Sequence, residues 1–223
     1  MPSIVTVGKF DSDGVADVTK ILQEFDQKAA TELPQLRRRQ VFVYSDVYVH
    51  MQDWDVTDYA EACRVATTDP RCAQLNESLS VYFGDHAGTE DWDGPIDQPA
   101  AERFYLWPAE HLENLEKTYS AVIVNTQRQE HNSEVARLFA ESDATDIPVT
   151  MGTLRRQLYL WRGIYLHIQD FAEPDPVKVI SAVWTEGDPR FLQLVDDLTQ
   201  LIPPYDPAGN SLATRFYYWA AEV

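Results

Sequence analysis

Two stretches of this chain carry the same arginine–histidine pattern. Arg39 is followed eleven residues later by His50, and Arg156 is followed at the same spacing by His167. Arginine is a permanently charged hydrogen-bond donor, whereas histidine takes up or releases a proton near neutral pH. Such a pair can stabilise a developing oxyanion and move a proton. The sequence therefore offers one candidate acid–base set in each half.

The pattern belongs to a longer internal repeat. Residues 38–54 align without a gap with residues 155–171, and seven of the seventeen positions are identical, where about one would be expected from composition. Further matches are Asp69-Pro70-Arg71 with Asp188-Pro189-Arg190 and Arg103–Trp107 with Arg215–Trp219. We predict two domains, 1–110 and 118–223, with a linker near Pro108–Lys117 and an acidic surface loop at 84–99 in the first half alone.

Each half shows the same order of predicted elements, which are an alternating strand, an amphipathic helix, a hairpin, a long helical region and a last aromatic strand. The first strands are 4–10 and 121–126, the hairpin of the first half pairs 40–44 with 47–54, and the helical regions are 57–82 and 176–202. Proline after an aspartate should break each helical region. The order β-α-β-β-α-β predicts an α+β protein with two ferredoxin-like domains.

A two-residue turn at Ser45-Asp46 would fix the hairpin register. Counting outward from it, Arg39 and His50 lie on one face as diagonal neighbours, with Cβ atoms roughly 7–8 Å apart. Both faces of the hairpin are largely apolar, so both must be covered. We expect helices on one face and the other domain's sheet on the second, which predicts an internal pseudo-dimer of the dimeric α+β barrel type.

Several polar and aromatic residues share the face of the two arginines and are candidate substrate contacts. They are Tyr48, Gln52 and Trp54 in the first half, and Tyr165, Gln169 and Phe171 in the second. Burying polar groups among apolar ones costs free energy unless they form hydrogen bonds. The residues around each arginine therefore either satisfy one another in a core network or bind a ligand.

Asp26 and Asp143 each stand near the end of the first helix of their half, where the helix dipole disfavours a carboxylate. An inward-pointing aspartate there would have a raised pKa and could act as a base. An outward-pointing one would only form the turn after the helix.

Composition excludes several classes of function. The chain has 36 acidic and 18 basic residues, a net charge of −18, which disfavours nucleic acid and anionic membranes as partners. No signal segment or membrane span is evident, so we expect a cytoplasmic protein, with Cys63 and Cys72 as reduced thiols. Neither a phosphate-binding glycine loop nor a convincing metal-ligand spacing is present, and we expect no cofactor and no metal.

These residues carry a resemblance to the tetracenomycin-type aromatic (type II) polyketide cyclases. The matching segments of the second half are Asp143–Pro148, Met151–Leu158, Gly163–Phe171, Gly187–Phe191 and Arg215–Trp219. Those of the first half are Thr31–Pro34, Arg37–Gln40, Val47–His50 and Arg103–Trp107. Some family members have a histidine directly before the aspartate, where this chain has Phe25 and Ser142.

The resemblance implies a fused dimer of ferredoxin-like units. It implies cofactor-free, aldol-type ring closure on a poly-β-ketone intermediate in antibiotic-type biosynthesis, with an acyl carrier protein as a further candidate partner. The implied acid–base and oxyanion sets are Arg39, His50 and Asp26 in the first half, and Arg156, His167 and Asp143 in the second.

Two other functions stay open at this stage. A cofactor-independent, quinone-forming monooxygenase would also need an aromatic pocket with arginine and histidine, and a product that has gained oxygen would identify it. A non-catalytic chaperone module of a polyketide synthase complex would bind ligand without changing it.

Overall fold

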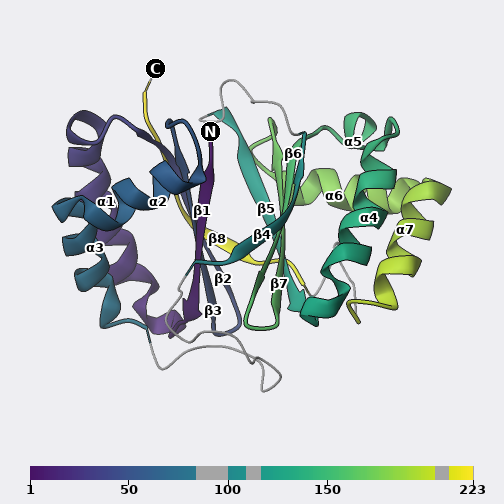
Figure 1. Ribbon diagram of the computed structural model, residues 1–223, viewed down its shortest axis with the longest axis horizontal. Helices are drawn as coiled ribbons and strands as arrows, with labels where there is room; N and C mark the ends of the chain where they lie inside the picture. Colours follow the sequence, from purple (N-terminus) through teal and green to yellow (C-terminus); the bar gives the residue numbers. More distant parts are fainter. Residues whose placement is uncertain (84–99, 109–116, 204–210, 223) are drawn as a thin grey trace. The chain divides into compact units, whose positions relative to one another are not determined.

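The computed structural model describes residues 1–83, 100–108, 117–203 and 211–222. They form two compact α+β units, each with a four-stranded antiparallel sheet and helices (Figure 1). The predicted loop at 84–99, and all of the predicted linker except its two ends, lie outside these residues. The predicted fold class is confirmed, while the packing of one sheet on the other stays a prediction.

The first unit contains the sheet β1-β3-β2-β8. Its elements are β1 (Ser3–Lys9), a 3-10 turn (Ser12–Gly14), α1 (Val15–Glu32), β2 (Leu36–Tyr44), β3 (Val47–Trp54), α2 (Tyr59–Thr68), α3 (Pro70–Ser80) and β8 (Thr214–Ala220).

The second unit contains the sheet β4-β6-β7-β5. Its elements are β4 (Glu102–Trp107), β5 (Tyr119–Thr126), a 3-10 turn (Gln129–His131), α4 (Asn132–Asp143), α5 (Ile147–Thr150), β6 (Thr153–Trp161), β7 (Ile164–Phe171), α6 (Pro176–Glu186) and α7 (Pro189–Thr199).

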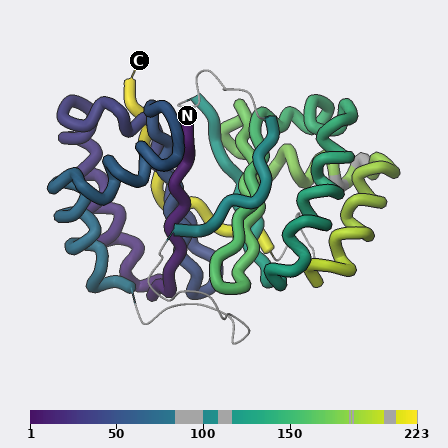
Figure 2. The backbone as a smooth tube through the Cα atoms, viewed as in Figure 1, coloured from purple at the N-terminus to yellow at the C-terminus, as the bar shows by residue number. Residues whose placement is uncertain are grey.

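The two repeats exchange their last strands. The expectation that each aromatic strand closes its own half is wrong, because β8 pairs with β2 and β4 pairs with β6. In Figure 2 the yellow trace of β8 runs among the purple and blue strands of the first unit. The sequences of β4 and β8 are nearly the same, so their pattern could not indicate which sheet each would join. Each compact unit therefore contains the last strand of the other repeat, so its residues are not those of the proposed domains 1–110 and 118–223.

The hairpin register follows the count from the turn. Tyr44 pairs with Val47, and Arg39 with Gln52. The turn is two residues long, and Ser45 has a φ of 52°. The second hairpin turns at Arg162-Gly163 with φ values of 48° and 76°, the left-handed conformation that such tight turns require.

Helices cover the face of each sheet that carries the arginine and the histidine. The predicted breaks lie where expected, because Asp69 and Asp188 each cap a helix that begins with proline. In the first unit Val18 and Leu22 of α1 pack on Val41 and other residues of the sheet. In the second unit α4 and α7 pack on β6 and β7. The helices thus bury the candidate site.

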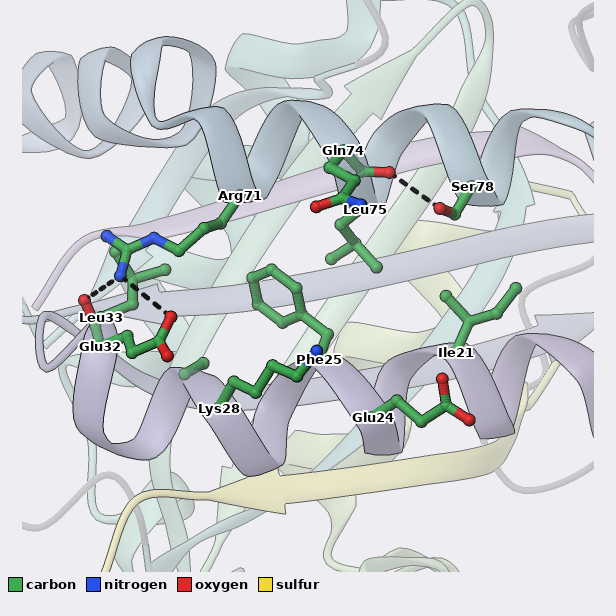
Figure 3. Close-up of a pocket in the computed structure, with 11 residues that line it drawn as sticks. Ile21, Glu24, Phe25, Lys28, Glu32, Leu33, Arg71, Gln74, Leu75 and Ser78 are labelled. Atoms are coloured by element: carbon green, nitrogen blue, oxygen red, sulfur yellow. Dashed lines mark hydrogen bonds and ion pairs between the residues drawn. The ribbon is translucent and has the colours of Figure 1, made fainter.

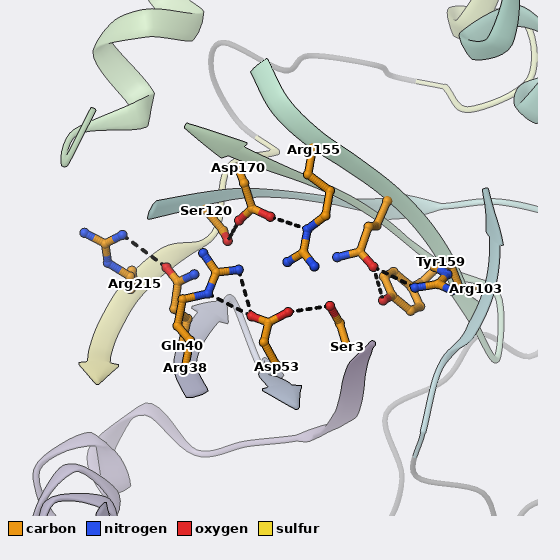
Figure 4. Close-up of polar contacts among 11 residues, drawn as sticks. Ser3, Arg38, Gln40, Asp53, Arg103, Ser120, Arg155, Tyr159, Asp170 and Arg215 are labelled. Atoms are coloured by element: carbon orange, nitrogen blue, oxygen red, sulfur yellow. Dashed lines mark hydrogen bonds and ion pairs between the residues drawn. The ribbon is translucent and has the colours of Figure 1, made fainter. Parts of the chain in front are cut away.

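A polar triad joins three strands on the opposite face of each sheet. In the first unit Asp53 accepts hydrogen bonds from Arg38 Nε at 2.8 Å and Ser3 Oγ at 2.5 Å (Figure 4). The second unit repeats the arrangement with Asp170, Arg155 and Ser120. Because each aspartate lies on the strand between its two partners, the triad fixes the relative position of all three strands.

We expect a fragment of residues 1–108 to form a homodimer. Without β8 the edge of β2 exposes unpaired backbone groups, and strand 102–107 has lost its partner β6. Two copies of the fragment can pair all of these backbone groups if strand 102–107 of each copy joins the edge of β2 in the other. Size-exclusion chromatography with light scattering measures the mass, and a monomeric fragment with full strand content in circular dichroism would contradict the expectation.

Candidate active site

In the first unit four elements bring four polar side chains together. Arg39 on β2 donates from Nε to both carboxylate oxygens of Asp26, at 3.0 Å each. Its Nη1 lies 2.6 Å from Nε2 of His50 on β3. The hydroxyl of Tyr217 on β8 donates to Asp26 Oδ2 at 2.8 Å. All four are buried, so the sequence-predicted trio forms one cluster with an additional tyrosine.

Burial governs the electrostatics of this cluster. It raises the pKa of Asp26, although Arg39 and the Tyr217 hydroxyl oppose that shift. Burial, together with the positive charge of Arg39, holds the pKa of His50 well below its usual range. His50 is therefore neutral at pH 7, and its Nε2 accepts from the arginine, so the ring proton resides on Nδ1.

The second unit repeats the cluster with looser contacts. The hydroxyl of Tyr105 donates to Asp143 Oδ2 at 2.8 Å, and Arg156 Nη2 lies 3.4 Å from Asp143 Oδ1. The guanidinium carbon of Arg156 lies 4.7 Å from the ring centroid of Phe139, a cation–π distance. Burial raises the pKa of Asp143 and lowers that of His167, where Arg156 adds to the effect.

A small cavity adjoins the second cluster, with a volume of about 10 Å³, room for one water molecule. Four of its lining residues are polar, namely Ser142, Arg156, His167 and Gln169. The rest of the wall is apolar and comes from α4, α5 with the residue after it, α6 and α7. It consists of Phe139, Ile147, Met151, Ile180, Phe191, Leu194, Val195 and Leu198.

The predicted substrate contacts occupy different surroundings. Gln169 lines the cavity, and Gln52 is partly buried. The aromatic candidates belong to apolar core clusters, with Tyr48 under α1 and α3, Trp54 beside α2, Tyr165 under α4 and α7, and Phe171 beside α6. Their role as substrate contacts stays a prediction.

Sequence reasoning missed Tyr105 and Tyr217. The signal was present, because the two tyrosines occupy the same position in the matching segments Arg103–Trp107 and Arg215–Trp219. Their function was hidden by the strand exchange, since each repeat supplies the tyrosine for the other repeat's aspartate. Each cluster is thus built from both halves of the sequence.

Within the described residues, no group of three or more histidine, cysteine or acidic side chains is placed to hold a metal ion. In the same residues no helix is long and apolar enough to cross a membrane. Cys63 and Cys72 are free thiols, as predicted.

Comparisons with known proteins agree with this architecture. The sequence profile of the family described as "Polyketide synthesis cyclase" matches residues 2–108 and again 119–220. The chain belongs to this family, and it contains two copies of the family's domain.

Individual relatives match one copy at a time. Tetracenomycin F2 cyclase of Streptomyces glaucescens is 27% identical over 107 residues, which is 46% of this chain and 95% of that protein. An uncharacterized protein of Streptomyces coelicolor is 34% identical over 92 residues, 39% of this chain and 80% of its own length.

Several solved structures match nearly the whole chain. A putative monooxygenase from Lactobacillus acidophilus has a TM-score of 0.57, with 99% of this chain and 97% of that chain covered. At 6% sequence identity the likeness shows a shared fold.

The neutral histidines should make stability fall at acid pH. Below about pH 6.5 the unfolded chain binds protons at His50 and His167 while the folded chain does not, so the free energy of unfolding decreases as pH falls. The His50→Asn variant and the His167→Asn variant each lack the proton uptake of one histidine. Urea unfolding should show that the difference in free energy of unfolding between wild type and either variant shrinks by up to about 1.4 kcal/mol per pH unit as the pH falls. A gap that stays constant between pH 7.5 and 5.5 would argue against neutral histidines.

Loss of the tyrosine hydroxyls should destabilise both units. Tyr217→Phe and Tyr105→Phe each remove a donor from a buried carboxylate, which costs about 1–3 kcal/mol of unfolding free energy. Tyr82→Phe is the control for a hydroxyl lost elsewhere in the first unit. Equal unfolding midpoints for Tyr217→Phe and the control would show that this hydrogen bond contributes nothing.

Proposed function

We propose that this chain is an aromatic polyketide cyclase that closes a ring on a poly-β-ketone by aldol addition and loss of water. The observation that carries the proposal is the buried arginine–histidine–aspartate–tyrosine cluster, present in each unit on the helix-covered face of the sheet. Membership of the polyketide cyclase family supports the substrate class. The antibiotic-type pathway and an acyl carrier protein partner belong to this proposal as well.

The first step is removal of a proton. A CH₂ group between two carbonyls is acidic, and the neutral imidazole of His50 or His167 can accept its proton. The neighbouring arginine donates to the enolate oxygen and stabilises its negative charge. In the first unit Arg39 already donates to His50, so the arginine must transfer that hydrogen bond to the substrate before the imidazole can act.

The second step forms the ring. The enolate carbon attacks a carbonyl carbon of the same polyketide chain, and the carbonyl oxygen becomes an alkoxide that takes up the proton held by the imidazolium. Dehydration then removes a second CH proton while the hydroxyl leaves as water. The carboxylate of the aspartate, whose pKa is raised by burial, can accept this CH proton and pass it to the leaving hydroxyl. No electrons are transferred to an acceptor, so the reaction requires no redox cofactor.

We expect the active histidine and arginine to control both rate and product. His167→Ala should reduce turnover by at least about tenfold, since loss of a general base typically costs 10²–10⁴, and the products should shift toward spontaneous shunts. Arg156→Ala should act in the same direction through loss of enolate stabilisation. Mass spectrometry of the products from a reactive poly-β-ketone measures both effects. Arg137→Ala, which removes an exposed guanidinium from α4, is the control.

The same experiment separates the alternatives. A product lighter by one water molecule supports cyclisation with dehydration, whereas a product heavier by oxygen would identify the monooxygenase. Unchanged rate and products in His50→Ala, His167→Ala and the double variant would assign both histidines to the core and leave pocket shape as the main agent. The chaperone hypothesis expects tight ligand binding and no change of product when Arg39, His50, Arg156 and His167 are all replaced.

A further inference from the structure

The two clusters differ at one pair of positions on their first helix. The residue before the aspartate is Phe25 in the first unit and Ser142 in the second. One turn earlier the helix carries Leu22 in the first unit and Phe139 in the second. Each arginine nevertheless has an aromatic ring beside it. The ring is Phe25 for Arg39, at 5.1 Å from guanidinium carbon to centroid, whereas Arg156 uses Phe139. The aromatic partner has therefore moved by one helical turn between the repeats.

In the first unit this ring closes the cluster. Phe25 points from α1 toward the space between α1 and α3, where it lines a groove of about 200 Å³ (Figure 3). The same ring lies beside the guanidinium of Arg39, and Arg39 has no exposed surface. Phe25 thus separates Arg39 from the groove. Asp26 and His50 engage Nε and Nη1 of Arg39, while its Nη2 has no hydrogen-bond partner within the described residues and lies behind the phenyl ring, away from the groove lining.

In the second unit no ring stands at the corresponding position, and a small cavity of about 10 Å³ adjoins the arginine. Ser142, which replaces the phenyl ring, is 9% exposed, and Arg156 is 2% exposed. Within the described residues neither Ser142 Oγ nor Arg156 Nε has a hydrogen-bond partner. Both residues line the cavity described above. A buried donor without an acceptor costs free energy, and here two of them adjoin one cavity.

We propose that Ser142 and Arg156 form a subsite for one oxygen atom of a flat, largely apolar ligand, and that Phe25 blocks the equivalent space in the first unit. The proposal rests on the proposed function for its ligand class, an aromatic polyketide with carbonyl or phenolate oxygens. One chain then binds one ligand, in its second unit.

The chemistry of the cavity selects this kind of ligand. One N–H donor, from Arg156, and one O–H donor, from Ser142, match the two lone pairs of a single carbonyl or phenolate oxygen. The other walls are apolar, so they fit an aromatic ring and not a hydrated anion such as phosphate. In the ligand-free chain the cavity is large enough only for the oxygen atom of such a ligand. The ring itself requires the apolar wall to move, including Met151, whose unbranched side chain adapts readily.

Equilibrium dialysis with 1,8-dihydroxyanthraquinone, a flat ligand with carbonyl and phenol oxygens, tests the proposal. Wild type should bind one equivalent per chain. Ser142→Ala should weaken binding about three- to tenfold through loss of one hydrogen bond, and Ser142→Phe should abolish it by filling the cavity. Ser133→Phe, on the exposed side of the same helix, is the matched control and should bind as wild type does.

The complementary variant opens the first unit. Phe25→Ser should join the groove to Arg39 and add a second equivalent per chain. Thermal unfolding midpoints near that of wild type show that each variant is folded, and Ser142→Ala provides the test if the larger replacement does not fold.

Three results would overturn the proposal. They are two equivalents in wild type, no binding by wild type up to millimolar ligand, or binding that neither Ser142 variant alters. Because dialysis does not depend on turnover, binding of one equivalent that Ser142→Phe removes would support the subsite even if no cyclised product formed. Cyclised product with unaltered binding in the Ser142 variants would instead uphold the function and reject the subsite.

Discussion

A fully buried guanidinium is the constraint on which each unit depends. Arg39 has no exposed surface, and a charge in such a place is stable only with close hydrogen-bonded partners. Asp26 supplies the opposite charge from α1, and His50 supplies an acceptor from the neighbouring strand. The carboxylate is in turn held by Tyr217. The helix, the hairpin and the exchanged strand are thus joined at one arginine.

The sequence predicted the local part of this arrangement well. Side chains alternate strictly along a strand, so a two-residue turn at Ser45-Asp46 was sufficient to place Arg39 and His50 on one face. The inward orientation of Asp26 was one of two alternatives that sequence left open. The structure decides it, because the carboxylate contacts the arginine directly.

What sequence could not predict depends on contacts between distant segments. The last strands of the two repeats are so similar that either could complete either sheet, and the tyrosine partners were missed with them. The sequence also did not show that the ring beside the arginine comes from Phe25 in one repeat and, one helical turn earlier, from Phe139 in the other. The substitution before each aspartate was visible in the alignment, but its compensation one turn away becomes apparent only when both rings are found beside their arginines.

The strand exchange also governs how this chain can be made. The contacts between β2 and β8 join residues near position 40 to residues near position 218, and such non-local pairing gives a high contact order and slow folding. On the ribosome the first sheet cannot be completed when its own repeat has emerged. One edge of that sheet stays open until residues 214–220 of β8 have also emerged. During that interval the unpaired edge of β2 can pair with other chains, which makes the unfinished sheet prone to aggregation.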